Sequence, residues 1–252
     1  MQALLAGDMR PLTGDLLIEA WERGSGQDAL GRALLMLACG CPDVTAEQIS
    51  GWDIYERDIA LLRLRRMSFG ESLRGYLPCP SCAESLEFEI PVAPALQRLE
   101  EAKPAGNEAW QTGKFVFSLR TVNSHDLRAA AAAQPMTARR TLLERCASVR
   151  PMDDDVEAPA LGAWDFEEVV TEHFEQMHRG SEIVLTLLCP ACGAIEKAGF
   201  DIGRFLWCEV RHAAAALLRD VHELARAYGW AEEAILRMSG VRRSAYLEMA
   251  RA

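Results

Sequence analysis

Two Cys-Pro-x-Cys segments that lie far apart constrain this chain more than any other feature. The first is YLPCPSCAESLEFEI and the second is LTLLCPACGAIEKAGF. The pattern of each predicts a strand, a tight turn and a second strand. Two thiolates from one such turn take two corners of a tetrahedron about 2.3 Å from a metal ion, so two turns complete a site. The sequence therefore predicts one metal site with four ligands, Cys79, Cys82, Cys189 and Cys192.

The residue after the second cysteine of such a turn often adopts a left-handed backbone conformation, which lets N–H groups point at sulfur. Gly193 suits that conformation, whereas Ala83 suits it less well. A left-handed alanine costs about 1 to 2 kcal/mol. That cost is small beside the roughly 10 to 16 kcal/mol of apparent zinc binding from which folding can draw.

Zinc has competing interpretations. A redox motif would place its first cysteine at a helix N-terminus, but strands follow both segments here. Two unrelated thiol pairs remain a second alternative, and disulfides are a third, disfavoured by the lack of an export signal. We favour one structural Zn²⁺ ion, because four cysteine ligands leave no open coordination position for catalysis. The 106 residues that separate the two ligand pairs make this ion the closure of a long loop.

Charge and hydropathy restrict the partners. The 27 Lys and Arg residues against 37 Asp and Glu residues give a net charge of −10. Such a balance repels a phosphate backbone and disfavours nucleic-acid binding. The N-terminus lacks a basic region followed by an apolar one, and no run of about 18 apolar residues occurs. We therefore expect a cytoplasmic protein that binds neither nucleic acid nor membrane.

The remaining cysteines offer weaker candidates. Cys208 and His212 share a helix face at i and i+4, and their alanine-rich surroundings favour packing in the core. Cys39 and Cys41 flank one glycine, a poor chelate spacing, and are interpreted as a thiol pair in a loop.

No catalytic motif is present. HELAR, residues 222–226, lacks the second histidine of a zinc-protease motif, and no nucleophile elbow or glycine-rich phosphate loop occurs. His173 and His178 fall on different helix faces, which indicates a solvated surface. An enzyme is not indicated.

The segments together predict a predominantly helical α+β chain. Three parts are expected: a helical N-terminal part at 1–70, a zinc-ribbon-like unit at 71–201 with hairpins 73–91 and 182–201 around a helical insertion 92–181, and a helical C-terminal part at 202–252. An apolar stripe from Ile202 to Tyr228 predicts one long helix that Gly229 ends, followed by two short helices.

Finer expectations concern the strands and loops. Period-2 alternation predicts strands at 86–90 and 115–119, and the apolar run 183–188 predicts a strand buried on both faces. Residues 93–113 are interpreted as helix then loop, 151–164 as an exposed loop, and 164–178 as a helix. Asp126 or Ser124 is expected to cap the helix through the alanine run.

Several stretches carry a resemblance. They are LLIEAWERG, ERDIALLRLRRMSFG, the paired CPSCAESLEFEI and CPACGAIEKAGFDI, FLWCEV, LLRDVHELARAYGWAEEAILRMS and RRSAYLEM. The chain resembles the family of T-even-phage-type baseplate hub assembly chaperones found beside phage tail and contractile injection system genes. The resemblance implies a non-enzymatic assembly chaperone or minor baseplate component, with hub or spike proteins as its partners. The alternative function is a zinc-ribbon regulatory protein that binds nucleic acid.

Overall fold

The computed structural model describes residues 9–153 and 164–251. These residues form two compact units, and each unit combines segments that are distant in the sequence. Unit 1 takes its described residues from 1–46, 60–71 and 201–252, and unit 2 takes its residues from 47–59 and 72–200. In the described part of the chain, no helix is both long enough and apolar enough to cross a membrane.

Unit 1 is helical, and the long helix α9 runs through it. Its helices are α1 (Gly14–Gly24), α2 (Ala29–Gly40), most of α4 (Ile54–Phe69), α9 (Ile202–Tyr228), α10 (Glu232–Leu236) and α11 (Gly240–Arg251). The side chain of Asp201 caps the start of α9 by accepting the Arg204 N–H at 3.0 Å. Gly229 ends the helix in a left-handed conformation with φ 68°, as the sequence predicts. The long C-terminal helix and its C-cap are therefore confirmed.

Helix α9 buries its apolar stripe against α1, α2, α10 and α11. A Cβ atom placed on Gly24 would lie 2.5 Å from the Trp207 ring, so α1 and α9 approach closely only because this residue is glycine. Arg65 is 3% exposed and donates to both carboxylate oxygens of Glu209, at 2.9 and 2.6 Å. This ion pair joins α4 to α9 inside the unit.

Unit 2 holds all the strands found in residues 9–153 and 164–251. Its elements are α3 (Ala46–Gly51), the start of α4, β1 (Ser72–Pro78), β2 (Ser85–Pro91), α5 (Val92–Ala102), β3 (Glu108–Thr112), β4 (Phe115–Leu119), α6 (Ser124–Ala132), α7 (Pro135–Cys146), β5 (Ala147–Pro151), α8 (Trp164–His178), β6 (Ile183–Leu188) and β7 (Ile195–Phe200). The antiparallel sheet β3-β4-β5 shares one core with the helices that follow it. That core contains Phe117, Leu119, Val122, Leu143, Cys146, Ala147, Val170 and Met177.

The insertion departs from the sequence-based expectation in its strands and in one cap. Helix α5 matches the helix expected after residue 92, but the expected loop contains β3, which pairs with β4. Asn123, not Asp126 or Ser124, is the N-cap of α6, and it forms a capping box with Asp126. The expected loop at 151–164 lies mostly outside the described residues, and α8 forms at the predicted 164–178.

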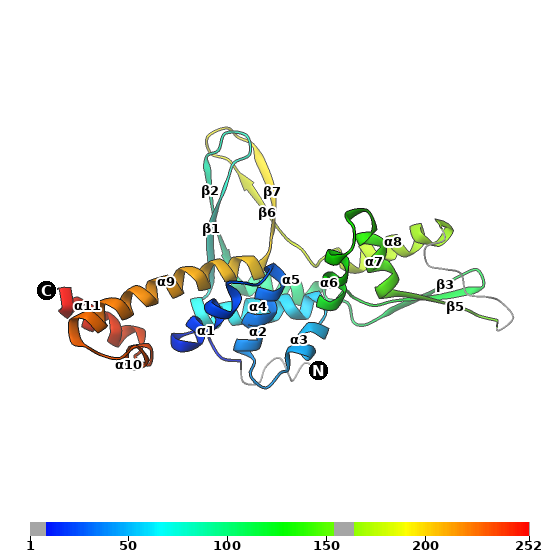
Figure 1. The fold of residues 1–252 in the computed structure, drawn as a ribbon. Coiled ribbons are helices and arrows are strands. Elements are labelled where there is room, and N and C mark those ends of the chain that lie inside the picture. Colours follow the sequence, from blue (N-terminus) through cyan, green and yellow to red (C-terminus); the bar gives the residue numbers. More distant parts are fainter. Residues whose placement is uncertain (1–8, 154–163, 252) are drawn as a thin grey trace. The chain divides into compact units, whose positions relative to one another are not determined.

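Two antiparallel hairpins complete unit 2. β1 pairs with β2 from Ser72↔Pro91 to Pro78↔Ser85, and β6 pairs with β7 from Ile183↔Phe200 to Leu188↔Ile195. Figure 1 shows the turns of the two hairpins close together. The prediction that 183–188 is buried on both faces is wrong, because every second residue of β6 is exposed. The coarse expectation of a mixed chain, with helices, small antiparallel sheets and a long C-terminal helix, is confirmed.

Candidate metal centre

The first Cys-Pro-x-Cys turn, which joins β1 to β2, closes on two backbone hydrogen bonds. The Cys79 N–H donates to the Glu84 carbonyl at 2.7 Å, and the Ala83 N–H donates to the Cys79 carbonyl at 2.8 Å. Ala83 is left-handed with φ 61°, as the sequence predicts. The N–H groups of Cys82 and Ser81 point at the Cys79 sulfur and lower its pKa to about 7. The turn therefore favours a thiolate at Cys79.

The second turn, between β6 and β7, repeats this geometry. The Cys189 N–H donates to the Ala194 carbonyl at 2.8 Å, and the Gly193 N–H donates to the Cys189 carbonyl at 3.0 Å. Gly193 has φ 73°, again left-handed. The Ala194 N–H favours the Cys192 thiolate, but the Cys189 sulfur, burial and the Cys79 sulfur outweigh it and raise the pKa of Cys192.

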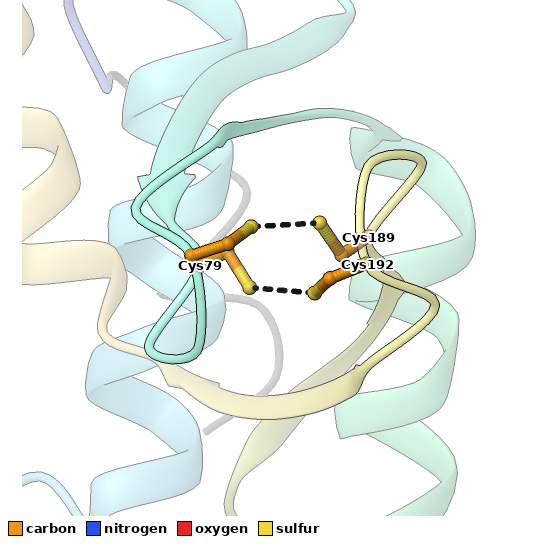
Figure 2. Close-up of side chains that lie close together, drawn as sticks. Cys79, Cys189 and Cys192 are labelled. Carbon is orange, nitrogen blue, oxygen red and sulfur yellow. Dashed lines mark hydrogen bonds between the residues drawn. The ribbon is translucent and has the colours of Figure 1, made fainter.

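The two turns bring four sulfur atoms together. All four Sγ atoms lie within 4.8 Å of one another. Cys79 and Cys192 are 3.7 Å apart at sulfur, and Cys82 and Cys189 are 3.6 Å apart (Figure 2). A tetrahedron with metal–sulfur bonds of about 2.3 Å has edges of about 3.8 Å, whereas a disulfide bond measures about 2.0 Å. These two sulfur–sulfur distances are compatible with ligands around one ion and are too long for disulfide bonds.

Electrostatics favour a cation between these thiols. The Glu84 N–H promotes ionisation of Cys82, yet the sulfurs of Cys192 and Cys189 act against it and raise the pKa of Cys82. Four thiols at this spacing cannot all ionise, because each thiolate opposes the next. A divalent cation removes that opposition, and the donor set therefore fits a soft or borderline metal.

The centre is half enclosed. Cys79 and Cys189 are 2% and 1% exposed, while Cys82 and Cys192 are exposed. Leu86 is buried beside the two inner cysteines, and two half-buried side chains, Leu187 and Ala194, pack against them. This small cluster is the apolar core that the two hairpins share at the turns.

The other cysteines do not join the centre. Burial raises the pKa of both Cys39 and Cys41, and the expected loop is wrong for Cys39, which lies near the end of α2. The expectation that Cys208 and His212 pack in the core is also wrong. Both are exposed, because they lie on the face of α9 opposite its buried stripe.

The two histidines of α8 are not the solvated pair that the sequence indicated. The His173 ring stacks on Trp110 with centroids 3.8 Å apart, and its Nδ1 lies 2.7 Å from Glu108. His178 Nε2 accepts the Val122 N–H at 3.1 Å, and burial lowers the pKa of His178. Both rings fix α8 to neighbouring segments of unit 2. Spacing could not show this, since the partners come from β3 and from the residues after β4.

Comparisons of the chain with protein-family models, with curated proteins and with solved structures find no match.

Proposed function

We propose that the four-cysteine centre binds one structural zinc ion and that the two hairpins around it form a zinc-ribbon-like unit. The carrying observation is the pair of sulfur–sulfur distances, 3.6 and 3.7 Å, between two turns of the same left-handed geometry. Four thiolate ligands close the coordination sphere, so the ion contributes folding free energy and no catalysis.

The proposed ion stabilises the turn ends of the two hairpins, where few side chains are buried. A two-stranded hairpin alone is marginal in water, and the fully buried side chains at the turns are Cys79, Leu86 and Cys189. The ion joins the two hairpins across a loop of 106 residues, so each hairpin gains the other as a partner.

Metal analysis tests this proposal. The purified native chain should contain one zinc per molecule. Cys82→Ala should abolish the zinc content, whereas Cys208→Ala, which removes another exposed cysteine, should leave it unchanged. A metal-free native chain, or equal zinc in both variants, would refute the proposal.

At the level of biology, we propose a non-enzymatic assembly chaperone or minor component for the baseplate hub of a phage tail or contractile injection system. The support is the resemblance, together with where its stretches fall. Those outside the Cys-Pro-x-Cys segments lie in α1, α4, α9, α10 and α11, which belong to unit 1 except for the first residues of α4. The paired segments form the candidate metal centre. Most of the resembling residues thus belong to the helices of unit 1 and to the candidate metal centre.

Two experiments test the biological proposal. The tagged chain should co-purify with hub or spike proteins encoded beside its gene, and a deletion strain should fail to assemble normal particles. Normal particles in the deletion strain would refute it. The alternative, a nucleic-acid-binding regulator, predicts salt-sensitive DNA or RNA binding. We expect no gel shift at low salt, given the net charge of −10.

A further inference from the structure

The outer face of the β6–β7 hairpin is apolar where a solvated surface is expected. Leu188 and Ile195 stand directly opposite each other next to the second cysteine turn, and each is 67% exposed. Val184, on the same face of β6, is 40% exposed. Lys197 lies between these apolar positions, opposite Thr186. We call Val184, Leu188, Ile195 and Lys197 the outer patch.

The β1–β2 hairpin provides an internal comparison. Aligning the two cysteine turns places each residue of one hairpin on the residue 110 positions later, since Cys79 and Cys82 match Cys189 and Cys192. The equivalents of Leu188 and Ile195 are Pro78 and Ser85, which also form a cross-strand pair. The metal turn is thus built equally well without the exposed Leu–Ile pair.

The rest of the patch differs between the hairpins in the same way. Val184 has Arg74 as its equivalent, and Arg74 forms an exposed ion pair with Glu89 at 2.9 Å. Lys197 has Glu87 as its equivalent. Folding does not require Leu188, Ile195 and Val184, because the equivalent positions on β1–β2 hold Pro78, Ser85 and Arg74. On that hairpin one aromatic side chain, Tyr76, is 73% exposed at the position equivalent to Thr186. Exposed apolar side chains that the fold does not need are typical of a binding surface.

We propose that the outer patch is where this protein binds its assembly partner, a protein that presents an apolar recess with a carboxylate beside it. This inference rests on the proposed function. Leu188 and Ile195 enter the recess, and Lys197 meets the carboxylate about two residues, or roughly 7 Å, along the strand. The chain as a whole has a net charge of −10, whereas Lys197 is positive. Lys197 therefore attracts an acidic group of the partner to the outer patch, although the net charge of the chain repels acidic groups.

Charge also argues against two other occupants. A second copy that used the same patch about a twofold axis would bring two Lys197 side chains together at the middle of the contact. An anionic membrane would be repelled by the net charge of −10. A separate protein with a carboxylate at its binding site avoids both the repulsion between two Lys197 side chains and the repulsion between the chain and an anionic membrane.

The test removes the apolar pair and reverses the charge of the outer patch, where possible with residues found at the equivalent positions of the first hairpin. Leu188→Ser is combined with Ile195→Ser, and the second substitution introduces the serine found at the equivalent position 85. Met136→Ser is its control, since Met136 is 95% exposed and lies on α7. Lys197→Glu introduces the glutamate found at position 87, and Lys114→Glu, in the exposed turn between β3 and β4, is its charge-matched control. Each variant is first checked for zinc content and thermal unfolding, which should match the native chain.

Binding to purified hub and spike proteins encoded beside the gene is then measured by biolayer interferometry. The double serine variant should raise Kd by about 30-fold or more, equivalent to about 2 kcal/mol, mainly through faster dissociation. Lys197→Glu should slow association and reverse its dependence on salt. Both controls should bind like the native chain.

The outcomes separate this inference from the proposed function. If the native chain binds none of these proteins, the proposed function fails and this inference with it. If the native chain binds but the double serine variant stays within threefold of its Kd, the proposed function stands and the outer patch is refuted. If sedimentation shows that the native chain self-associates and the double serine variant does not, a second copy occupies the patch and the proposed partner is wrong.

Discussion

Replacing Asp126 by alanine should remove the ionic centre of the insertion. Its carboxylate is 0% exposed and accepts from Arg120 at 2.6 and 3.0 Å, and from Arg145 at 2.9 Å. It also accepts the Asn123 N–H at 3.1 Å and lies 3.6 Å from the Cys146 sulfur. Asp126→Ala therefore leaves several donors without their acceptor.

The expected magnitude follows from burial. Removing one member of a buried ion pair costs about 3 to 5 kcal/mol. Arg120 and Arg145 are 35% and 42% exposed at the side chain, so water can solvate them after the substitution. We therefore expect Asp126→Ala to lower the free energy of unfolding by about 3 kcal/mol, which corresponds to a decrease of roughly 6 to 12 °C in the melting temperature of unit 2. Glu144→Gln, which breaks the exposed Arg140 pair, is the control and should cost under about 1 kcal/mol.

The pH dependence of stability provides a second measurement of the contacts of Asp126. Burial raises the pKa of Asp126, but Arg120, the Asn123 N–H and Arg145 outweigh burial and hold it at about 2. Since the folded pKa lies below the unfolded one, the stabilisation is complete above about pH 4 and is lost as pH falls toward 2. It amounts to about 2 kcal/mol.

Urea denaturation of the native chain and of Asp126→Ala, with hydrogen exchange of the peptides covering β4 and α6, measures the difference between them. That difference should shrink between pH 4 and pH 2. A difference under about 1 kcal/mol at pH 7, or one independent of pH, would refute the reasoning.

Three further predictions concern single positions. Ala83→Gly should strengthen zinc retention against a competing chelator by about fivefold and Gly193→Ala should weaken it similarly, because left-handed alanine costs about 1 kcal/mol. Gly24→Ala should lower the melting temperature of unit 1 by several degrees, since the added Cβ would lie 2.5 Å from Trp207. The pKa of His178, measured by NMR, should lie below its ordinary value because burial disfavours the charged ring. Unit 2 should therefore lose stability as pH falls below about 6.5, because the unfolded chain then binds a proton more readily than the buried ring does.

The sequence predicted the cluster of four cysteines better than its surroundings, for a physical reason. The turn at Cys79 is set by local backbone geometry, so even the left-handed Ala83 could be expected. The same holds for α9, where an apolar stripe and Gly229 act within one helix. Strand β3 had no such local signal, because EAWQT becomes a strand through its pairing with β4.

Strand β6 shows that an apolar sequence is also a limited predictor of burial. An apolar run such as IVLTLL predicts burial on both faces, yet Leu188 is 67% exposed. Hydrophobicity along the chain cannot tell a side chain buried by its own fold from one available to a partner. The comparison between the two hairpins can, because Pro78 and Ser85 show what the fold alone requires.

Metal removal should melt the two hairpins and spare the insertion between them. The core of Phe117, Leu143, Val170 and their neighbours includes none of the four cysteine ligands. The turns of the hairpins bury only Leu86 beside Cys79 and Cys189. A zinc chelator should therefore abolish hydrogen-exchange protection in β1, β2, β6 and β7 while β3, β4 and β5 keep theirs. Equal loss of protection in both sets would mean that the ion stabilises the whole of unit 2, and equal retention would mean that the hairpins fold without it.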